Sequence, residues 1–320
     1  MYYRVIQFVY RYSKQPLDKA KTMLTSEQKQ ISNFYRYPNG MLNVGWLAGF
    51  IRGVRPGAKM FYVQQTNNSN LMIPVYLKKG QSIPSRFKEM SPVKVICHIE
   101  GGMVDAEHLP GKDDGSGVLI LPTERIARAV AIGFDAANIL DMPPTLAFDK
   151  VPPKGAPRDD PKFEFKPFSR DESMADSSNM VRIAGFVQAV SMQPQDKGEA
   201  SDCCIILIRQ TADESECIPV RYYDKRKAQA VCDRIKRGMP IAIDAAIRVR
   251  AKPIGQIDEA SGIAPVARYP YLHTIQPPII CTQREIIHTP DWAAVMLTEY
   301  AAKRDRKPVA APIVTTEGLD

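Results

Sequence analysis

Aromatic and cationic residues alternate along several segments of this chain whose composition is typical of β-strands. Trp46, Phe50 and Arg52 fall on one side of an extended segment, because successive side chains of a strand point to opposite faces. Exposed rings can stack on unpaired nucleobases, and each stacked base contributes about 1–3 kcal/mol whatever its identity. Neighbouring arginines and lysines can neutralise phosphates. The pattern therefore indicates a surface for single-stranded nucleic acid, with packing of Trp46 and Phe50 under an N-terminal helix as the alternative.

The segment that carries these residues occurs twice. Residues 43–54 and 179–190 both begin with Asn and both contain Ala-Gly-Phe. Three further matches follow in the same order, and the spacing grows only where loops would lengthen, at residues 191–201 and before Pro240. They pair Gln65-Thr66 with Gln210-Thr211, Ile73-Pro74-Val75 with Ile218-Pro219-Val220, and residues 92–95 with residues 240–243. The chain is therefore predicted to use one small β-rich unit twice, as repeat one and repeat two.

Strand alternation separates the core positions of each repeat from its binding positions. Leu47, Gly49 and Ile51 match Ile183, Gly185 and Val187, and all six are apolar or glycine, so this side is predicted to be core. The opposite side is polar or aromatic in both repeats. For any one basic residue there, a solvated surface role is an equal alternative. The candidate nucleic-acid-binding residues are Trp46, Phe50, Arg52, Lys59, Tyr62, Tyr76, Lys78, Lys79, Arg86 and Lys88 in repeat one, and Arg182, Phe186, Arg209, Arg221 and Tyr223 in repeat two.

The elements that must position these residues follow from the apolar periodicity and the turn residues. Repeat one is predicted to contain strands at 43–54, 59–66, 71–78 and 92–100, ended by Gly101-Gly102, a fifth strand within 103–122, and a helix over 123–140. Repeat two follows the same order, with an amphipathic helix over 222–237, closed by Gly238, and a strand over 240–250. A strand at 2–12, a helix at 17–34 and a last helix from Asp291 to about Lys303 complete the set.

Charge and proline content divide the chain further. Residues 1–42 hold seven Lys or Arg and two Asp or Glu, a net charge of +5, and residues 43–101 carry +6. Residues 102–178 carry −5 and residues 179–320 carry +2, within a total of +8. A basic, aromatic-rich beginning indicates a polyanionic partner, and repeat one is the more basic repeat. The predicted order is a basic aromatic arm (1–42), the first domain (43–140), a Pro-rich acidic linker (141–178), the second domain (179–304) and a disordered tail (305–320).

Several classes of function lack support in the sequence. The four histidines have no visible nucleophile partner motif, and residues 111–117 lack the Lys-Ser/Thr ending of a nucleotide loop, so neither an enzyme nor a cofactor is expected. The six cysteines form no Cys-x-x-Cys pair, which favours reduced thiols over a metal site. No apolar run is long enough to span a bilayer and no signal peptide is apparent, so we expect a cytoplasmic protein, or one inside the host cell if it comes from a phage.

Five strands with a helix between the third and fourth is the order of an oligonucleotide/oligosaccharide-binding (OB) barrel. The segments Asn43…Leu47-x-Gly49-x-Ile51 and Asn179…Ile183-x-Gly185-x-Val187, with residues 218–243, resemble the bacterial and phage single-stranded DNA-binding protein family. The resemblance covers under half of the chain. The sequence ends in Thr-Glu-Gly-Leu-Asp, without the acidic, Pro-Phe-terminated tail common in that family.

The resemblance implies a mainly β chain of two tandem OB-fold-like five-stranded barrels joined by the Pro-rich acidic linker. It also implies sequence-tolerant binding of single-stranded DNA in replication, recombination or repair, and a homodimer. A single-stranded RNA-binding protein is one alternative, because stacking platforms do not distinguish DNA from RNA unless they contact the 2′-hydroxyl. A structural protein that uses the barrels for protein contacts is the other.

Overall fold

The computed structural model describes the two repeats and the C-terminal helix. The described residues are 40–66, 68–113, 115, 119–137, 178–193, 203–224, 227–255, 265–281, 285–286 and 288–305. The predicted strand at 2–12 and helix at 17–34 lie outside them, as do most of the arm, linker and tail.

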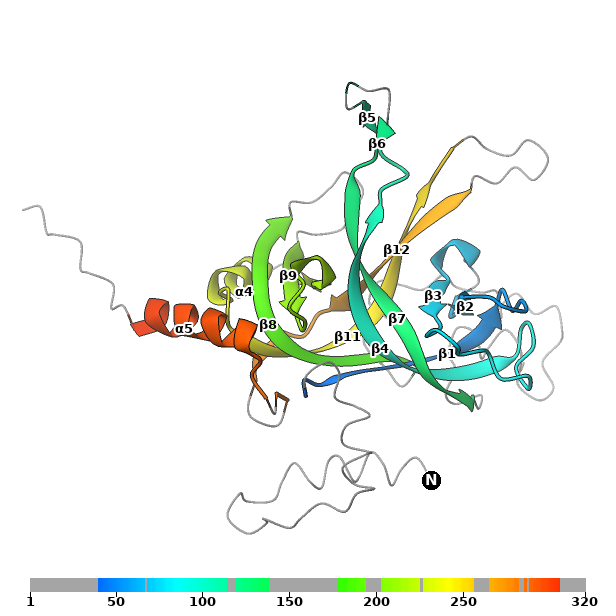
Figure 1. The fold of residues 1–320 in the computed structure, drawn as a ribbon, viewed down its shortest axis with the longest axis horizontal. Helices are drawn as coiled ribbons and strands as arrows, with labels where there is room; N and C mark the ends of the chain where they lie inside the picture. The colour runs from blue at the N-terminus through cyan, green and yellow to red at the C-terminus, as the bar shows by residue number, and fades with distance from the viewer. Residues whose placement is uncertain are drawn as a thin grey trace, which may run out of the picture. The chain divides into compact units, whose positions relative to one another are not determined.

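The described chain is mainly β, with two short helices (Figure 1). Repeat one contains β1 (Asn43–Arg52), β2 (Met60–Gln64), the 3₁₀ turn η1 (Ser69–Leu71), β3 (Ile73–Tyr76), β4 (Pro92–Asp105), β5 (Lys112–Asp113), β6 (Leu119–Ile120) and β7 (Thr123–Ala136). Repeat two contains β8 (Asn179–Gln193), β9 (Cys203–Arg209), η5 (Glu214–Glu216), β10 (Ile218–Tyr223), α4 (Ala228–Arg234), β11 (Pro240–Pro253), β12 (Val266–Thr274), β13 (Ile279–Ile280) and α5 (Asp291–Asp305).

Strand pairing closes on itself in each repeat. In repeat one β1 pairs with β2, β2 with β3, β3 with β7, β7 with β4, and β4 again with β1. Repeat two has the same circuit through β8, β9, β10, β12 and β11. Only the β3–β7 and β10–β12 pairs are parallel, and they occupy the same place in each circuit. The predicted duplication is therefore present in the strand pairing as well as in the sequence.

The prediction for residues 103–140 is wrong. β4 continues through Gly101-Gly102 to Asp105, and the fifth strand of the circuit is β7, where a helix was predicted. Ala127, Ala129 and Ala131 face the core, while Ile126 and Val130 on the other side of β7 are also buried. Apolar residues on both faces weaken the polar–apolar alternation that separates a strand from a helix, although Arg128 remains a half-buried polar position on the outer face. Figure 1 shows the short β5–β6 hairpin at the tip of the loop between β4 and β7.

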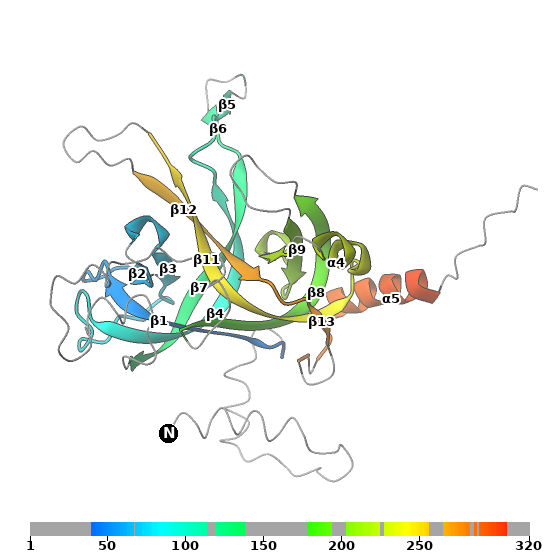
Figure 2. The same cartoon turned by 180° about the vertical axis from the view of Figure 1, so that it is seen from behind.

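A helix is present within the predicted range 222–237, but it is shorter than predicted. Tyr222 is fully buried and Tyr223 pairs with Cys203, so both continue strand β10. The helix α4 occupies only Ala228–Arg234, and Gly238 lies beyond its end against α5 rather than closing it. The last helix begins at Asp291, as predicted. Figure 2 shows α4 and α5 from the other side, both near the strands of repeat two.

The predicted core side of strand one is confirmed in both repeats. Leu47, Ile51, Ile183 and Val187 are each 0% exposed. The glycine between each pair permits close approach of the next strand, since a Cβ on Gly49 would lie 2.5 Å from the carbonyl oxygen of Gln64. A Cβ on Gly185 would likewise lie 2.7 Å from the carbonyl oxygen of Arg209, the counterpart of Gln64. Glycine is therefore needed at this point of both circuits.

The first strands of the two repeats pair with each other. β1 and β8 run antiparallel, with Gly45 opposite Val181, Asn43 opposite Ile183 and Leu47 opposite Asn179. Ile183 is the repeat-two counterpart of Leu47, and Asn179 that of Asn43. The register is therefore self-complementary, as in a two-fold symmetric contact between identical surfaces.

Buried amides are exchanged across this contact. Asn43 Nδ2 donates to Gln210 Oε1 at 2.6 Å and to the carbonyl of Ile99 at 2.7 Å, and its Oδ1 accepts the Ile99 amide at 2.7 Å. Asn179 Nδ2 donates in the same way to Gln65 Oε1 at 2.8 Å. Each asparagine and glutamine is at most 5% exposed. Because a buried polar group without a partner costs about 1–3 kcal/mol, these bonds specify how the repeats dock.

A second reciprocal contact lies at strand five. Arg125 on β7 donates to the carbonyl of Glu214 at 2.9 Å, and Arg268 on β12 donates to the carbonyl of Ser69 at 3.1 Å. Both carbonyls belong to the 3₁₀ turn after strand two of the opposite repeat. The repeats are therefore joined at two places by equivalent pairs of residues.

We predict that Asn43→Ala and Asn179→Ala each lower the free energy of unfolding by about 2–4 kcal/mol, because each leaves a glutamine oxygen and two backbone groups buried without partners. Urea unfolding followed by circular dichroism measures the change. Gln229→Ala, at an exposed position on α4, is the control and is expected to change stability by less than about 0.5 kcal/mol. A loss as small as that of the control in either asparagine variant would contradict the role given to the exchange.

Candidate nucleic-acid interface

Two tyrosines and an arginine form what we call the repeat one face. Tyr62 lies on β2, Tyr76 on β3 and Arg128 on β7, and all three are half-buried on the outer side of their strands. The Arg128 guanidinium carbon is 5.9 Å from the centroid of the Tyr76 ring. A Cβ at Gly102 would come within 2.7 Å of that guanidinium, so glycine makes room for it. Burial raises the pKa of Tyr76, with Arg128 acting in the opposite direction, so the ring remains a neutral phenol at pH 7.

Lysines lie at one end of this face. The amide of Leu77 donates to the carbonyl of Lys59 at 2.9 Å, which places Lys59 beside the end of β3. Lys59, Lys78 and Lys79 are exposed there. Arg86 and Lys88 are exposed in the following loop, where Arg86 donates to the carbonyl of Phe134 at 2.8 Å. Five of the predicted cations are thus at the surface, three of them at the ends of the strands that carry the tyrosines.

A second set of rings and cations forms the repeat two face. It consists of Arg221 and Tyr223 on β10, Arg248 on β11, and Tyr271 and His273 on β12. Arg221 lies opposite His273, and Arg248 lies opposite Tyr271. The Tyr223 and His273 rings are stacked, with centroids 4.8 Å apart and planes 21° apart, and the Arg221 guanidinium lies 5.1 Å from the Tyr271 centroid. Arg221 is itself only 7% exposed, so it supports this array of rings and guanidinium groups from below, and the half-buried residues Tyr223, Arg248, Tyr271 and His273 form its accessible part.

The electrostatics of this array are set by its arginines. Burial raises the pKa of Tyr223 and of Tyr271, so both phenols are neutral at pH 7. Arg221, Arg248 and Arg250 surround Tyr271 closely enough to oppose the shift of its pKa. Arg250 forms an ion pair with Glu124 of repeat one. The array therefore offers neutral rings beside positive charge, which suits a polyanion with aromatic bases.

Both faces contain a contact between a tyrosine ring and an arginine side chain, but the strands that supply the two residues are exchanged. Tyr76 and Arg221 hold the same place in strand three, next to Val75 and Val220, which pair with Ala129 and Leu272 on strand five. Arg128 and Tyr271 directly precede those residues on strand five. A ring–guanidinium pair therefore bridges strands three and five in both repeats, although neither position keeps its residue type.

The outer side of strand one differs from the prediction. Phe50 and Phe186 are 8% and 1% exposed, so the expectation that they form an open platform for bases is wrong. The Phe186 ring packs edge-on against Trp292 of α5, with centroids 5.6 Å apart. Trp46 is half-buried and lies between Ile96 on β4 and Met180 on β8.

Two predicted arginines are held in ion pairs. Arg52 Nε lies 3.1 Å from a carboxylate oxygen of Glu89. Arg182 forms a forked pair with Asp244 at 2.8 and 3.2 Å. Because a carboxylate already neutralises the charge of each arginine, neither residue belongs to the two faces.

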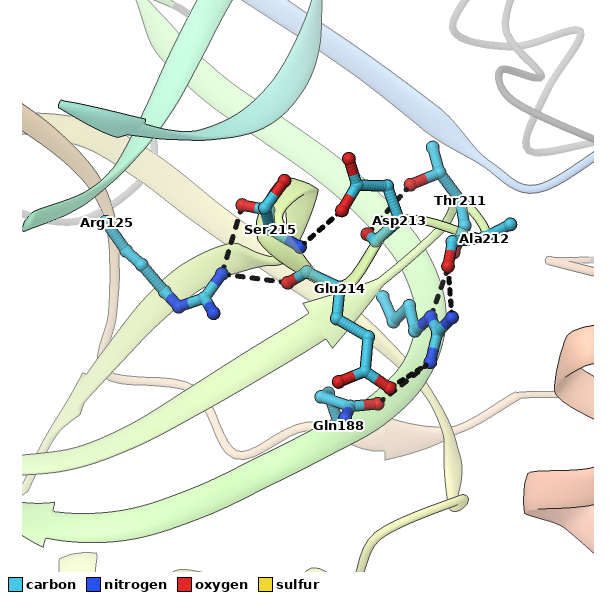
Figure 3. Close-up of polar contacts among 8 residues, drawn as sticks. Arg125, Gln188, Thr211, Ala212, Asp213, Glu214 and Ser215 are labelled. Carbon is cyan, nitrogen blue, oxygen red and sulfur yellow. Dashed lines mark hydrogen bonds and ion pairs between the residues drawn. The ribbon is translucent and has the colours of Figure 1, made fainter.

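Arg209 is held by the turn that follows it. Its guanidinium is bound to the carbonyls of Thr211 and Ala212, to Gln188 and to Glu214, and lies 4.8 Å from the Trp292 centroid. Figure 3 shows this turn between Gln188 on one side and Arg125 on the other. Arg209 is 8% exposed, and four of its five N–H groups are hydrogen-bonded within the protein, so we do not place it among the phosphate-binding residues. Its role is to connect the turn with α5.

The sequence pattern missed Arg128, Arg248, Tyr271 and His273. Arg128 lies in the stretch that was predicted to be helical, where alternation was not sought. Tyr269, Tyr271 and His273 recur at every second position, as do Arg248 and Arg250, which is the strand signal. That alternation could have identified the repeat two face.

No helix in the described part of the chain is long and apolar enough to cross a membrane. Nor does any group of three His, Cys, Asp or Glu side chains in those residues lie close enough together to hold a metal ion.

Comparison with solved structures gives partial matches, among them two structures of one protein. No family model matches the sequence, and no curated protein matches it. The crystal structure of wild-type single-stranded DNA binding protein from Thermus aquaticus is 11% identical and has a TM-score of 0.38, over 76% of this chain and 94% of that one. A deletion mutant of that protein is 11% identical with a TM-score of 0.39, over 76% and 95%.

We predict that Arg209→Ala lowers the free energy of unfolding by about 1–3 kcal/mol, because it removes several hydrogen bonds and a ring contact. Its affinity for a single-stranded oligonucleotide is expected to stay within about two-fold of the unaltered chain. Chemical unfolding and fluorescence anisotropy measure the two quantities. A large loss of affinity with unchanged stability would instead make Arg209 a binding residue.

Proposed function

We propose that this chain is a single-stranded nucleic-acid-binding protein in which each closed circuit of strands is an OB-fold-like barrel. More particularly, we infer that it binds single-stranded DNA with little dependence on sequence, and that it acts by binding rather than by catalysis.

The observation that carries this proposal is the ring–guanidinium pair bridging strands three and five in both repeats. Tyr76 with Arg128 and Tyr271 with Arg221 lie on outer strand faces, while the inner faces of the same strands form the core. Half-buried rings fixed by strands lose little side-chain entropy when a base stacks on them. Every base has a π-face, so such rings accept any sequence.

The distribution of charge favours nucleic acid over a protein partner. Lys59, Lys78 and Lys79 are exposed at the end of the repeat one face, in a segment with a net charge of +6. Exposed positive charges beside half-buried rings complement a phosphate backbone. A typical protein surface carries charges of both signs and would complement them less well. The resemblance at Asn43–Ile51 and Asn179–Val187 to single-stranded DNA-binding proteins favours DNA over RNA.

We predict that the chain binds fluorescein-labelled oligo-dT, and that its affinity falls linearly as the logarithm of the salt concentration rises. Anisotropy titrations with oligo-dT, oligo-U and a duplex of equal length measure the preference. Stronger binding to oligo-dT than to duplex is the expected result. Stronger binding to oligo-U than to oligo-dT would favour an RNA-binding protein. If the chain binds none of the three, the proposed function is wrong and the barrels would serve as a scaffold for protein contacts.

We predict that Tyr76→Ala weakens oligo-dT binding by about 5- to 150-fold, the equivalent of about 1–3 kcal/mol for one stacked base. Tyr76→Phe keeps the ring and is expected to bind within about three-fold of the unaltered chain. The same titration measures both variants, with thermal unfolding to show that each is folded. Equal losses in the two variants would point to the hydroxyl rather than to stacking.

A further inference from the structure

Arg268 of repeat two reaches the repeat one face. It is the third residue of β12, and its guanidinium carbon lies 5.2 Å from the centroid of the Tyr62 ring on β2. Its Nη2 donates to the carbonyl of Ser69 at 3.1 Å, and its Nη1 makes a longer contact, 3.5 Å, with the carbonyl of Val266. One ring of the repeat one face is therefore in contact with a cation from the other repeat.

The docking of the repeats explains only part of this arrangement. Arg125, the counterpart of Arg268, binds the carbonyls of Glu214 and Ser215 at 2.9 and 3.0 Å, and so makes the same kind of contact between repeats. The residue at the position equivalent to Tyr62 in repeat two is Leu207, which pairs with Pro219 as Tyr62 pairs with Pro74. The ring contact of Arg268 is thus an addition that docking does not require.

The charge of Arg268 is not neutralised by its surroundings. Its guanidinium forms no ion pair with any carboxylate of the described residues, and its two terminal nitrogens contact neutral carbonyls. Its Nε is buried and has no hydrogen-bond acceptor within the described part of the chain. A half-buried, unpaired guanidinium beside an aromatic ring retains its attraction for a phosphate.

We propose that Arg268 is a binding residue of the repeat one face: it holds the Tyr62 ring from one side and supplies the positive charge beside it to a phosphate of the bound single strand. Repeat one alone therefore has an incomplete site, which repeat two completes. This inference rests on the proposed function, since it names a further residue of the same interface.

Arg268→Ala and Arg125→Ala form a matched pair that tests the proposal. Each change removes one of the two reciprocal contacts between the repeats, but of these two arginines Arg268 is the one that contacts a ring of a candidate face. We expect Arg268→Ala to weaken binding of labelled oligo-dT by about 2- to 30-fold and to lower the slope of log affinity against log salt by about 0.7, the effect of one lost phosphate contact on a single strand. Arg125→Ala is expected to bind within about two-fold of the unaltered chain, with the same slope. Thermal unfolding of both variants shows whether they lose similar stability.

Arg268→Lys separates charge from shape. It is expected to keep the salt slope while losing part of the affinity, because lysine supplies a point charge without the planar group that lies on the ring. Combining Arg268→Ala with Tyr62→Leu is expected to cost less than the sum of the two single changes.

The failures of the two proposals are distinguishable. Equal losses of affinity in Arg268→Ala and Arg125→Ala, with equal changes in slope, would show that Arg268 only joins the repeats and would overturn the inference. An unaltered chain that binds none of oligo-dT, oligo-U and duplex removes the proposed function itself.

Discussion

Asn43 of repeat one binds Gln210 of repeat two, and Asn179 of repeat two binds Gln65 of repeat one. Each asparagine also holds the backbone of strand four in its own repeat, at Ile99 and Ile247. These groups are buried, so a shifted register would leave several polar atoms without partners, at a cost comparable to the whole stability of a small domain. The amides therefore fix the pairing of β1 with β8, and the other contacts between the repeats follow from that register.

Both candidate faces are built on the same strands as the core, and the docking of the repeats brings Arg268 of repeat two to Tyr62 of the repeat one face. The inner side of β3 buries Val75 while its outer side presents the half-buried Tyr76; β10 buries Val220 on its inner side and places Arg221, which is only 7% exposed, on its outer side. Rings and cations on strands are held more rigidly than on loops, which favours stacking without reorganisation. The loops add exposed charge, as at Lys78 and Lys79. Rigidity comes from the strands and long-range attraction comes from the loops.

The sequence predicted those parts of the fold that depend on local pattern and on the repeat. The alternation at Leu47 and Ile51 identified the core side of strand one, and the recurrence of Asn, Gln-Thr and Ile-Pro-Val identified the duplication. The fifth strand escaped prediction because Ile126 and Val130 on its outer side are buried like Ala127, Ala129 and Ala131 on its inner side, which leaves Arg128 as the main polar position of the alternation.

Of the candidate residues, Tyr62, Tyr76, Arg221 and Tyr223 lie on the two faces, since their strands alternate clearly. Phe186 and Arg209 do not, because Trp292, far along the chain, covers both. No local pattern reports that contact. Arg268 was not among the candidates because its ring partner, Tyr62, belongs to the other repeat, and no local pattern indicates a contact between repeats.

The exchanged ring–guanidinium pair also bears on how the two halves diverged. If one residue of the pair changes at a time, the exchange passes through either two arginines or two tyrosines on strands three and five. Two facing guanidinium groups would repel each other by about 1–3 kcal/mol at such a separation, whereas two facing tyrosines attract each other. Tyrosine on both strands is therefore the less costly intermediate between the arrangements of the two repeats.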